Sequence, residues 1–350
     1  MNNHHQKLFC TFFLFFTLCS FAQTEEEKVN KPKLFNETEL LPIRLKYSRK
    51  GIKKETDDST YIKSKLSYLA KNEDWETLDI KLRVRGNFRK KTCFFTPLKV
   101  KIKKEDAKGT VFKGEKKLKL VLPCLKESGN DDYVIKEYIA YKMYEVISPY
   151  YFKTRLLDIE YENLKKKDSK IYNLKGFFIE DDESVAKRFD GHVYKRPIYP
   201  KSFDDLEALR NAFFQCMIGN TDFSPTYQHN MKLLFIDKKF IPVPYDFDLS
   251  GLVNSSYAVV SRSRKAPLPI DDVTDRYFLG YKRDLRMFHI VKEEYIINKS
   301  KIMDAIEAHK VYFENKSAFY EAKRYIQEFY TVLEDEDKFK SKIIDIAKKI

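Results

Sequence analysis

Residues 219–248 read GNTDFSPTYQHNMKLLFIDKKFIPVPYDFD, and this stretch is the most informative part of the 350-residue chain. A helical pattern ends at Gly219-Asn220, and a polar loop that carries Asp222 follows. Asn230 then precedes a strand-like run, MKLLFI, and a second run, FIPVPY, leads directly into Asp246-Phe247-Asp248. The pattern predicts a β-hairpin that begins after one acidic loop and ends at a second acidic segment.

This order of polar residues is also the order in which a phosphoryl-transfer site places its parts. In such a site a first Asp orients or deprotonates the attacking hydroxyl, and an Asn and a second Asp hold Mg²⁺ against the phosphates. Mg²⁺ prefers hard oxygen ligands, which carboxylates and amide carbonyls supply. Asp222 would take the first role, and Asn230, Asp246 and Asp248 would be the magnesium ligands. The alternative is an ordinary turn rich in Asn and Asp between two strands.

The same motifs carry a resemblance to a known family. HNMKLLFID and PVPYDFD, preceded by Asn220-Thr221-Asp222, resemble the catalytic core of the CotH (spore-coat protein H) family of atypical kinases. Arg85-Gly86-Asn87 and the following basic run PLKVKIKK are similar to the RGN segment and the Lys-rich strand of that family. The likeness extends over residues 80–250. It breaks at Phe88–Cys93, where the family continues with small hydroxyl residues.

The resemblance implies an α+β, atypical protein-kinase-like fold of two lobes, with an antiparallel N-terminal sheet and a mostly helical C-terminal part. A β-rich nucleotide-binding lobe is expected over residues 36–180, and a catalytic and helical lobe over 181–350. The implied cofactors are ATP and Mg²⁺, and the implied partner is a protein substrate with a Ser or Thr acceptor. Lys195 lies in a segment similar to the Tyr-Lys segment of the family and is a further candidate for nucleotide contact.

Three strands with alternating apolar and basic residues are predicted at Leu78–Arg85, Leu98–Lys103 and Lys117–Leu122. Short polar turns join them, so an antiparallel sheet with one apolar and one basic face is expected. Most of its lysines should lie in solvent. Lys99 and Lys101 follow the RGN element and are the candidates for contact with the ATP phosphates, as a strand-borne Lys is in kinases.

Two helices flank the central motifs. Apolar residues at helical spacing predict one helix over residues 132–148, and Glu137 in its first half would pair with the phosphate-binding Lys or lie on an exposed face. The second is expected over residues 203–218, with Ser202 and Asp205 as a capping pattern. Other strands are expected at residues 39–47, 153–162, 171–180 and 192–195, a polar loop at 48–62, and mostly helices beyond 270.

The N-terminus and the cysteines indicate an exported protein. Residues 1–22 have the basic start, apolar core and small-residue end of a signal peptide, and residues 23–35 read as a linker. The mature protein is therefore expected in the periplasm or outside the cell, and not spanning the membrane. Cys93 and Cys124 flank neighbouring predicted strands, so an oxidising compartment would join them. Cys216 lies in a helical apolar stripe and is expected to be a buried free thiol.

The formal net charge of +14 favours anionic partners such as phosphates or an anionic envelope polymer, and no specific nucleic acid is expected. No phosphate-binding GxxxxGK[ST] loop is present. Two other functions stay open. A catalytically inactive scaffold would recognise nucleotide or anionic polymer through the same fold. A hydrolase would use Asp222 and Asp246 as general acid and base.

Overall fold

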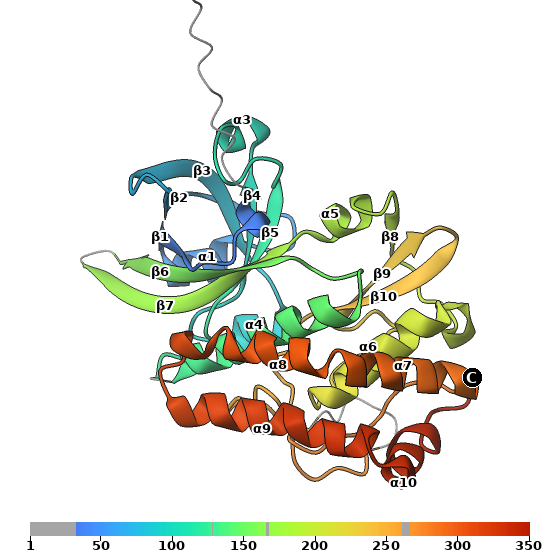
Figure 1. Cartoon of the computed structure of the whole chain (residues 1–350). Helices are drawn as coiled ribbons and strands as arrows, with labels where there is room; N and C mark the ends of the chain where they lie inside the picture. Colours follow the sequence, from blue (N-terminus) through green and yellow to red (C-terminus); the bar gives the residue numbers. More distant parts are fainter. Residues whose placement is uncertain (1–32, 128, 166–167, 261–266) are drawn as a thin grey trace, which may run out of the picture. The chain divides into compact units, whose positions relative to one another are not determined.

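The computed structural model describes residues 33–127, 129–165, 168–260 and 267–350. The predicted signal peptide over residues 1–22 and most of the predicted linker lie outside the described residues. Pro32–Ile350 form one compact unit. Figure 1 shows its strands β1–β7 in the upper part of the view and the long helices of the second half of the chain below them.

Seven strands form a barrel, which is closed by the pairing of the first strand with the sixth. This pair is parallel, and every other neighbouring pair is antiparallel. The order around the barrel is β1-β2-β3-β4-β5-β7-β6. Apolar residues alternate along the strands and fill the interior, as Leu78, Ile80 and Leu82 do on the third strand. The strands are β1 Leu41–Tyr47, β2 Ile62–Leu69, β3 Trp75–Val84, β4 Leu98–Ile102, β5 Lys117–Val121, β6 Thr154–Leu164 and β7 Ser169–Glu180.

The predicted two-lobed, protein-kinase-like fold is wrong. The predicted basic strands do pair as β3-β4-β5, but they belong to a closed barrel and not to an open N-terminal sheet. Closure depends on two features that the sequence did not reveal. β2 begins at Ile62, the last residue of the expected loop, and continues through residues for which no strand was predicted. β1 pairs with β6, which is more than a hundred residues away along the chain. Closing the sheet leaves no exposed strand edge.

Three short helices lie between strands of the barrel: α1 Arg49–Glu55, α2 Asn87–Thr92 and α3 Lys104–Ala107. α1 also lies in the stretch expected to be a loop, and the Ser48 hydroxyl caps it by accepting a hydrogen bond from the amide of Gly51 at 3.1 Å. α2 begins after Gly86, whose φ of 79° is accessible to glycine. The helix begins at Asn87, the last residue of the Arg85-Gly86-Asn87 motif, so the motif turns the chain from β3 into α2.

The longer helix α4, Asn130–Ile147, links the barrel to the helical half of the molecule. It packs against β6 and β7 on one side and against α8 on another. Its position explains why every residue from Val134 to Tyr141 is buried, so that all faces of the helix are covered there. Figure 1 shows α4 between the barrel and the lower helices. The helix predicted over residues 132–148 is therefore confirmed, with an environment more buried than expected.

The predicted hairpin is also confirmed, as β9 Met231–Ile236 and β10 Lys239–Pro244, and β8 His192–Tyr194 adds a third strand to this sheet. Asp237 and Lys238 both have positive φ, as a tight two-residue hairpin turn requires. The helix that precedes the hairpin is α6, Asp205–Met217. Its cap is Asp204, which accepts from the Glu207 amide at 3.0 Å, and not the predicted Ser202, because Ser202 lies in a separate 3-10 turn.

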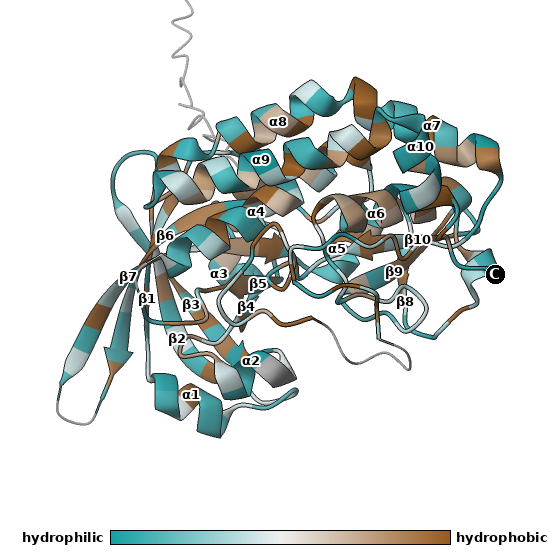
Figure 2. Cartoon of the chain, turned by 90° about the horizontal axis from the view of Figure 1, so that it is seen from below, coloured by the Kyte–Doolittle hydropathy of each residue, from teal (hydrophilic) through white to brown (hydrophobic). Residues whose placement is uncertain are grey.

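From Leu285 onward the chain is mostly helical, close to the prediction for residues beyond 270, and α7 and α8 pack on α6 and α4. Figure 2 shows α8 and α9 with hydrophilic and hydrophobic residues interleaved along their length, as amphipathic helices have. In the described part of the chain no helix is both long and apolar enough to cross a membrane. The remaining helices are α5 Asp182–Lys187, α7 Leu285–Ile297, α8 Lys299–Glu307, α9 Lys316–Leu333 and α10 Glu336–Phe339, with short 3-10 turns at Leu34–Asn36, Pro200–Ser202 and Lys310–Tyr312 and a π-turn at Lys340–Ile344.

Candidate functional site

The β9–β10 hairpin brings the two acidic segments together. The Tyr245 amide donates a hydrogen bond to the Asn230 carbonyl at 3.1 Å, so the residue before the hairpin lies beside the residue after it. Asn230 and Asp246 both have left-handed backbone conformations, with φ of 50° and 68°. Asn and Asp tolerate this region better than most residues do. The chain therefore turns sharply just before β9 and just after β10.

Asp222 is held by a network of short polar contacts. The Asn230 Nδ2 donates to the Asp222 carbonyl at 2.7 Å and to Asp222 Oδ2 at 3.0 Å. His229 Nε2 lies 3.1 Å from the other carboxylate oxygen. The Asp222 amide donates to Asn220 Oδ1, and the buried Asn220 side chain is itself fixed by Gln215. The side chain of Asp222 is still 20% exposed, so a substrate hydroxyl could reach it.

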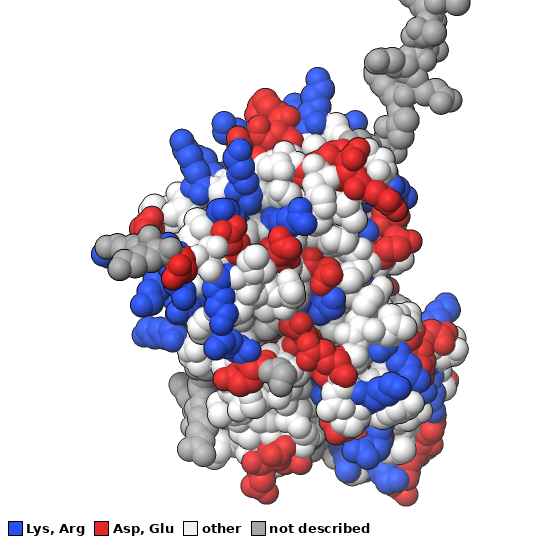
Figure 3. Space-filling view, turned by 90° about the vertical axis from the view of Figure 1, so that its left-hand side faces the viewer, with Lys and Arg blue, Asp and Glu red and all other residues white. Residues whose placement is uncertain are grey.

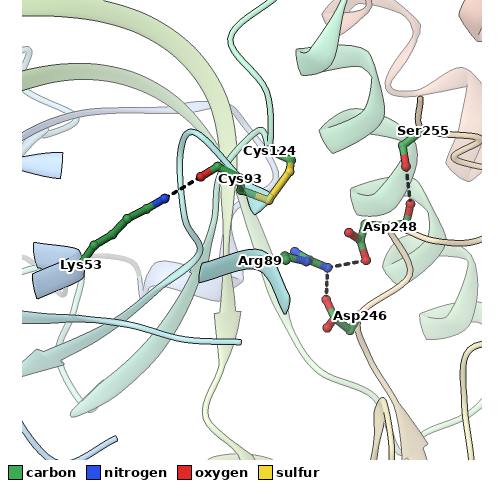
Figure 4. The surroundings of a disulfide bond; sticks show 7 residues. All are labelled: Lys53, Arg89, Cys93, Cys124, Asp246, Asp248 and Ser255. Atoms are coloured by element: carbon green, nitrogen blue, oxygen red, sulfur yellow. Dashed lines mark hydrogen bonds and ion pairs between the residues drawn. A yellow bond between two sulfur atoms is a disulfide. The ribbon is translucent and has the colours of Figure 1, made fainter. Parts of the chain in front are cut away.

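The second acidic segment is bound by an arginine from the barrel half. Figure 4 shows the Arg89 guanidinium between Asp246 and Asp248, in contact with both carboxylates. Arg89 lies on α2, which follows β3, and its side chain is only 10% exposed. Burial raises the pKa of Asp248; the Arg89 guanidinium opposes this effect and the neighbouring Asp246 adds to it. Two carboxylates are thus held close together by one cation.

Glu137 on α4 is the third acid of this cluster. It is 2% exposed, and its Oε1 atom has no hydrogen-bond partner among the described residues. Burial raises its pKa, Asp248 and Asp246 raise it further, and the nearby Arg89 lowers it. One turn along the same helix, the Tyr141 hydroxyl accepts a hydrogen bond from the Asp246 amide at 2.9 Å. The cation near Glu137 is Arg89 and not a lysine, so neither the expected Lys–Glu pair nor the exposed position is found.

Two lysines, one buried and one partly exposed, lie next to the acidic cluster. Lys119 on β5 contacts one oxygen of Asp182, and Lys232 on β9 lies 3.2 Å from the other. Although burial raises it, the two lysines hold the pKa of Asp182 below its ordinary range. The Lys119 ammonium also lies over the rings of Phe152 and Tyr245, at 4.2 and 4.9 Å from their centroids. Tyr245 directly precedes Asp246, so cationic and acidic groups are adjacent.

The structure places the predicted nucleotide-binding residues in different surroundings. Glu137 lies in the acidic cluster. Lys99 is partly exposed at the outer face of β4, 3.8 Å from Asp181. Lys101 is exposed on the same face and lies 5.5 Å from the centroid of the Tyr61 ring. Lys195 is exposed just after β8. The lysine that enters the site is Lys119, which is the direct neighbour of Lys99 across the β4–β5 pair.

Sequence reasoning missed Arg89, Lys119, Lys232 and Asp182. Arg89 lies in the segment that departs from the family pattern, so its charge at that place was the available signal. Lys119 could not be separated from its neighbour Lys117, since both alternate with leucines in KLKLV. What distinguishes Lys119 is its cover by Phe152 and Tyr245, which are distant in sequence.

The donor set of the acidic cluster suits a hard cation in its chemistry. Carboxylate oxygens are the ligands that Mg²⁺ prefers, and Asp246 and Asp248 supply them here. In the described ranges, however, no three acidic, His or Cys side chains converge as they would around an ion. Asp246 and Asp248 are instead arranged around the Arg89 guanidinium. The Asn230 amide nitrogen faces Asp222, so Asn230 orients that residue in this conformation.

Comparison with known proteins adds no relative. Neither a family model nor a curated protein matches the chain. The likeness to the CotH family therefore stays a prediction from the motifs. Cys93 and Cys124 lie at disulfide distance, with Cα atoms 4.5 Å apart, as the sequence predicted, and Cys216 is a buried thiol.

Proposed function

We propose that the chain is a Mg²⁺-dependent phosphotransferase that moves the γ-phosphoryl group of ATP to a Ser or Thr of a protein substrate. One observation carries the proposal: a single hairpin holds an oriented, solvent-accessible Asp222 beside the acidic pair Asp246 and Asp248. The proposal rests on this site and on the motif resemblance. It does not rest on the fold, which can serve many functions.

Asp222 would act on the acceptor hydroxyl. Its carboxylate is fixed by Asn230 and His229, so it can orient the hydroxyl and accept its proton as the new P–O bond forms. The bond from the γ-phosphorus to the ADP oxygen breaks in the same transfer. Most of the rate enhancement would come from positioning and charge neutralisation.

Asp246 and Asp248 would supply carboxylate oxygens to the metal ion, which when bound neutralises phosphate charge. Lys119 from the barrel and Lys232 from the hairpin would attract the phosphates, since Asp182 balances only one of their two positive charges. Asp246 has a side chain that is 23% exposed, so it can meet a ligand from solvent. Export of the protein to the periplasm or cell surface belongs to this proposal as the setting of the reaction.

The first test is calorimetric titration of the mature protein with ATP and Mg²⁺. We expect binding that EDTA abolishes and that Asp246→Asn weakens by about tenfold or more, a loss of at least 1.4 kcal/mol. Asp79→Asn is the matched control, because Asp79 is an exposed acid on the outer face of β3. ATP binding that neither EDTA nor Asp246→Asn changes would contradict the proposed role of the acidic pair.

A second candidate function is recognition of an anionic polymer. Lys63, Lys81, Lys101 and Lys117 lie directly opposite one another on the four neighbouring strands β2, β3, β4 and β5. Like charges in such cross-strand positions are destabilising. A row with a spacing of about 4.8 Å would suit an extended polyanion. On the face drawn in Figure 3, Lys and Arg side chains crowd the left of the upper half. A protein with this function alone would show no Mg²⁺-dependent ATP binding in the titration.

A further inference from the structure

A cavity of about 240 Å³ lies at one end of the barrel, where β1 and β6 begin and β2 ends. Leu41 lines it from the start of β1, Leu69 from the end of β2 and Arg155 from the start of β6. Leu34 and Val111 also line it, and the Leu34 amide donates to the Val111 carbonyl at 2.8 Å. The mouths of β-barrels are common places for ligands, and pockets for drug-sized molecules have about 300–1,000 Å³. This cavity therefore suits a small molecule.

The Arg155 side chain is buried in the wall of this cavity with few partners. It lies on the same side of β6 as Leu157, a residue of the barrel core, because alternate residues of a strand share a face. Arg155 is 6% exposed. In the described ranges its Nε atom has no hydrogen-bond partner, and its Nη1 atom makes a long hydrogen bond to the Leu34 carbonyl, at 3.4 Å. Burying an uncompensated charge is unfavourable, so an anionic partner would stabilise Arg155 here.

The charged residues of the lining leave room for one more negative charge. Glu37 is already paired with Lys71, at 3.0 Å between Oε1 and Nζ. Lys33 and Arg155 then face Glu39 alone, so two positive charges are opposed by one negative charge. Burial lowers the pKa of Arg155, and Glu39 is the first of the charges that oppose this effect. A ligand with a single negative charge would complete the balance, whereas a dianion such as phosphate would be repelled by the two glutamates.

The rest of the lining is apolar, so the ligand should carry an apolar body. Leu34 and Leu41 are buried, and Leu69, Ala70 and Val111 are partly buried around the same space. Removing an apolar body from water against such side chains is favourable. A carboxylate is the anionic group that suits the arginine, because its two oxygens match two N–H groups of a planar guanidinium.

We infer that this cavity binds a small monocarboxylate with an apolar body. Its carboxylate pairs with Arg155, and its body packs on Leu69 and Val111. The site is separate from the proposed phosphotransfer site, because neither Asp222 nor Asp246 lines the cavity. Failure of phosphoryl transfer would therefore leave this inference unaffected, and the reverse also holds.

The test is calorimetric titration of the full mature chain with sodium octanoate. We expect the wild type to bind octanoate and Arg155→Met to bind it more weakly by about tenfold or more, because the carboxylate loses its partner. Arg44→Met is the matched control and should bind as the wild type does, since Arg44 pairs with Glu160 on the outside of the barrel and does not line the cavity. No binding by the wild type, or equal binding by Arg155→Met, would overturn the inference.

Two further measurements keep the test valid if Arg155→Met does not fold. Ala70→Phe fills the cavity from a partly buried position and should abolish octanoate binding. In the wild type, 1-octanol should bind more weakly than octanoate by about tenfold or more, and inorganic phosphate should not displace octanoate. Unchanged binding by Ala70→Phe would place the ligand elsewhere. Equal binding of octanol would show an apolar pocket without a role for Arg155, and displacement by phosphate would show a simple anion site; each result would contradict the inference.

Discussion

At the scale of single residues, Glu137 is the clearest conflict between stability and function. A carboxylate at 2% exposure, near two other acids and with one oxygen that has no hydrogen-bond partner in the described part of the chain, is unfavourable when it is charged. The structure relieves this by raising its pKa, through burial first and through Asp248 and Asp246 second. Such strongly perturbed groups are typical of functional sites.

This raised pKa predicts how stability depends on pH. The folded protein keeps the Glu137 proton to a higher pH than the unfolded chain, whose Glu titrates near about 4.3. The stabilising effect is therefore fully present below that pH and is lost as pH rises through the raised folded-state value. Without added metal, Glu137→Gln should be more stable than the wild type at pH 9. At pH 5 this difference in stability should be smaller or absent.

Thermal unfolding at several pH values checks this prediction. Burial also raises the pKa of Glu115 and of Asp131, each to about 7. These two groups should therefore also contribute to the loss of wild-type stability as the pH rises. The difference between Glu137→Gln and the wild type isolates the contribution of Glu137. A difference that stays constant from pH 5 to pH 9 would show that Glu137 does not titrate in this range.

At the scale of elements, α2 is fixed at its C-terminal end by Cys93. The Cys93–Cys124 pair connects the end of α2 to the segment after β5, and it sets the backbone position from which Arg89 reaches the acids. The two cysteines are 31 residues apart, for which chain entropy predicts a stabilisation of about 3–4 kcal/mol once they are joined.

We therefore expect the free energy of unfolding of the double variant Cys93→Ser/Cys124→Ser, measured by chemical denaturation, to be lower than that of the wild type by about 3–4 kcal/mol. The side chains of Glu137 and Arg89 should become more mobile. Hydrogen exchange over residues 86–93 should become faster, because α2 would be anchored less firmly. Cys216→Ser is the control, since that thiol is buried away from the pair. A double variant as stable as this control would show that the Cys93–Cys124 pair does not stabilise the fold.

Elements with a strong local pattern were predictable from the sequence, and long-range closure was not. The leucines and valines of β3, β4 and β5 alternate cleanly, and the two-residue turn of the β9–β10 hairpin follows from the chain itself. β2 reads IKSKLSYL, with Leu66 and Tyr68 as its buried side chains, so its period is weak. Barrel closure depends on the pairing of β1 with β6, which no local pattern encodes. The same limit applies to the site. Asp222, Asp246 and Asp248 stand out in the sequence, but Arg89 and Lys119 come close to them only through tertiary packing.

At the scale of the whole molecule, the site lies where the main packing units meet. Phe247, between the two acids, is fully buried and packs on Tyr141 of α4 and Phe214 of α6, with ring centroids 4.7 and 5.4 Å apart. The hydrophobic core thus holds the backbone between Asp246 and Asp248. Because α4 also packs on β6 and β7, the barrel and the acidic cluster are mechanically connected. Function at this site would therefore depend on the integrity of the entire unit.

The most direct test of the central claim is transfer of label from [γ-³²P]ATP in the presence of Mg²⁺. The mature wild type, Asp222→Ala and the exposed-acid control Asp79→Ala would be compared with dephosphorylated casein as acceptor. Because an orienting base acts in the chemical step, Asp222→Ala should reduce turnover by about 10²–10⁴ with ATP affinity nearly unchanged, and the control should match the wild type. Equal transfer by Asp222→Ala and the wild type, or no transfer by any of the three, would contradict the account.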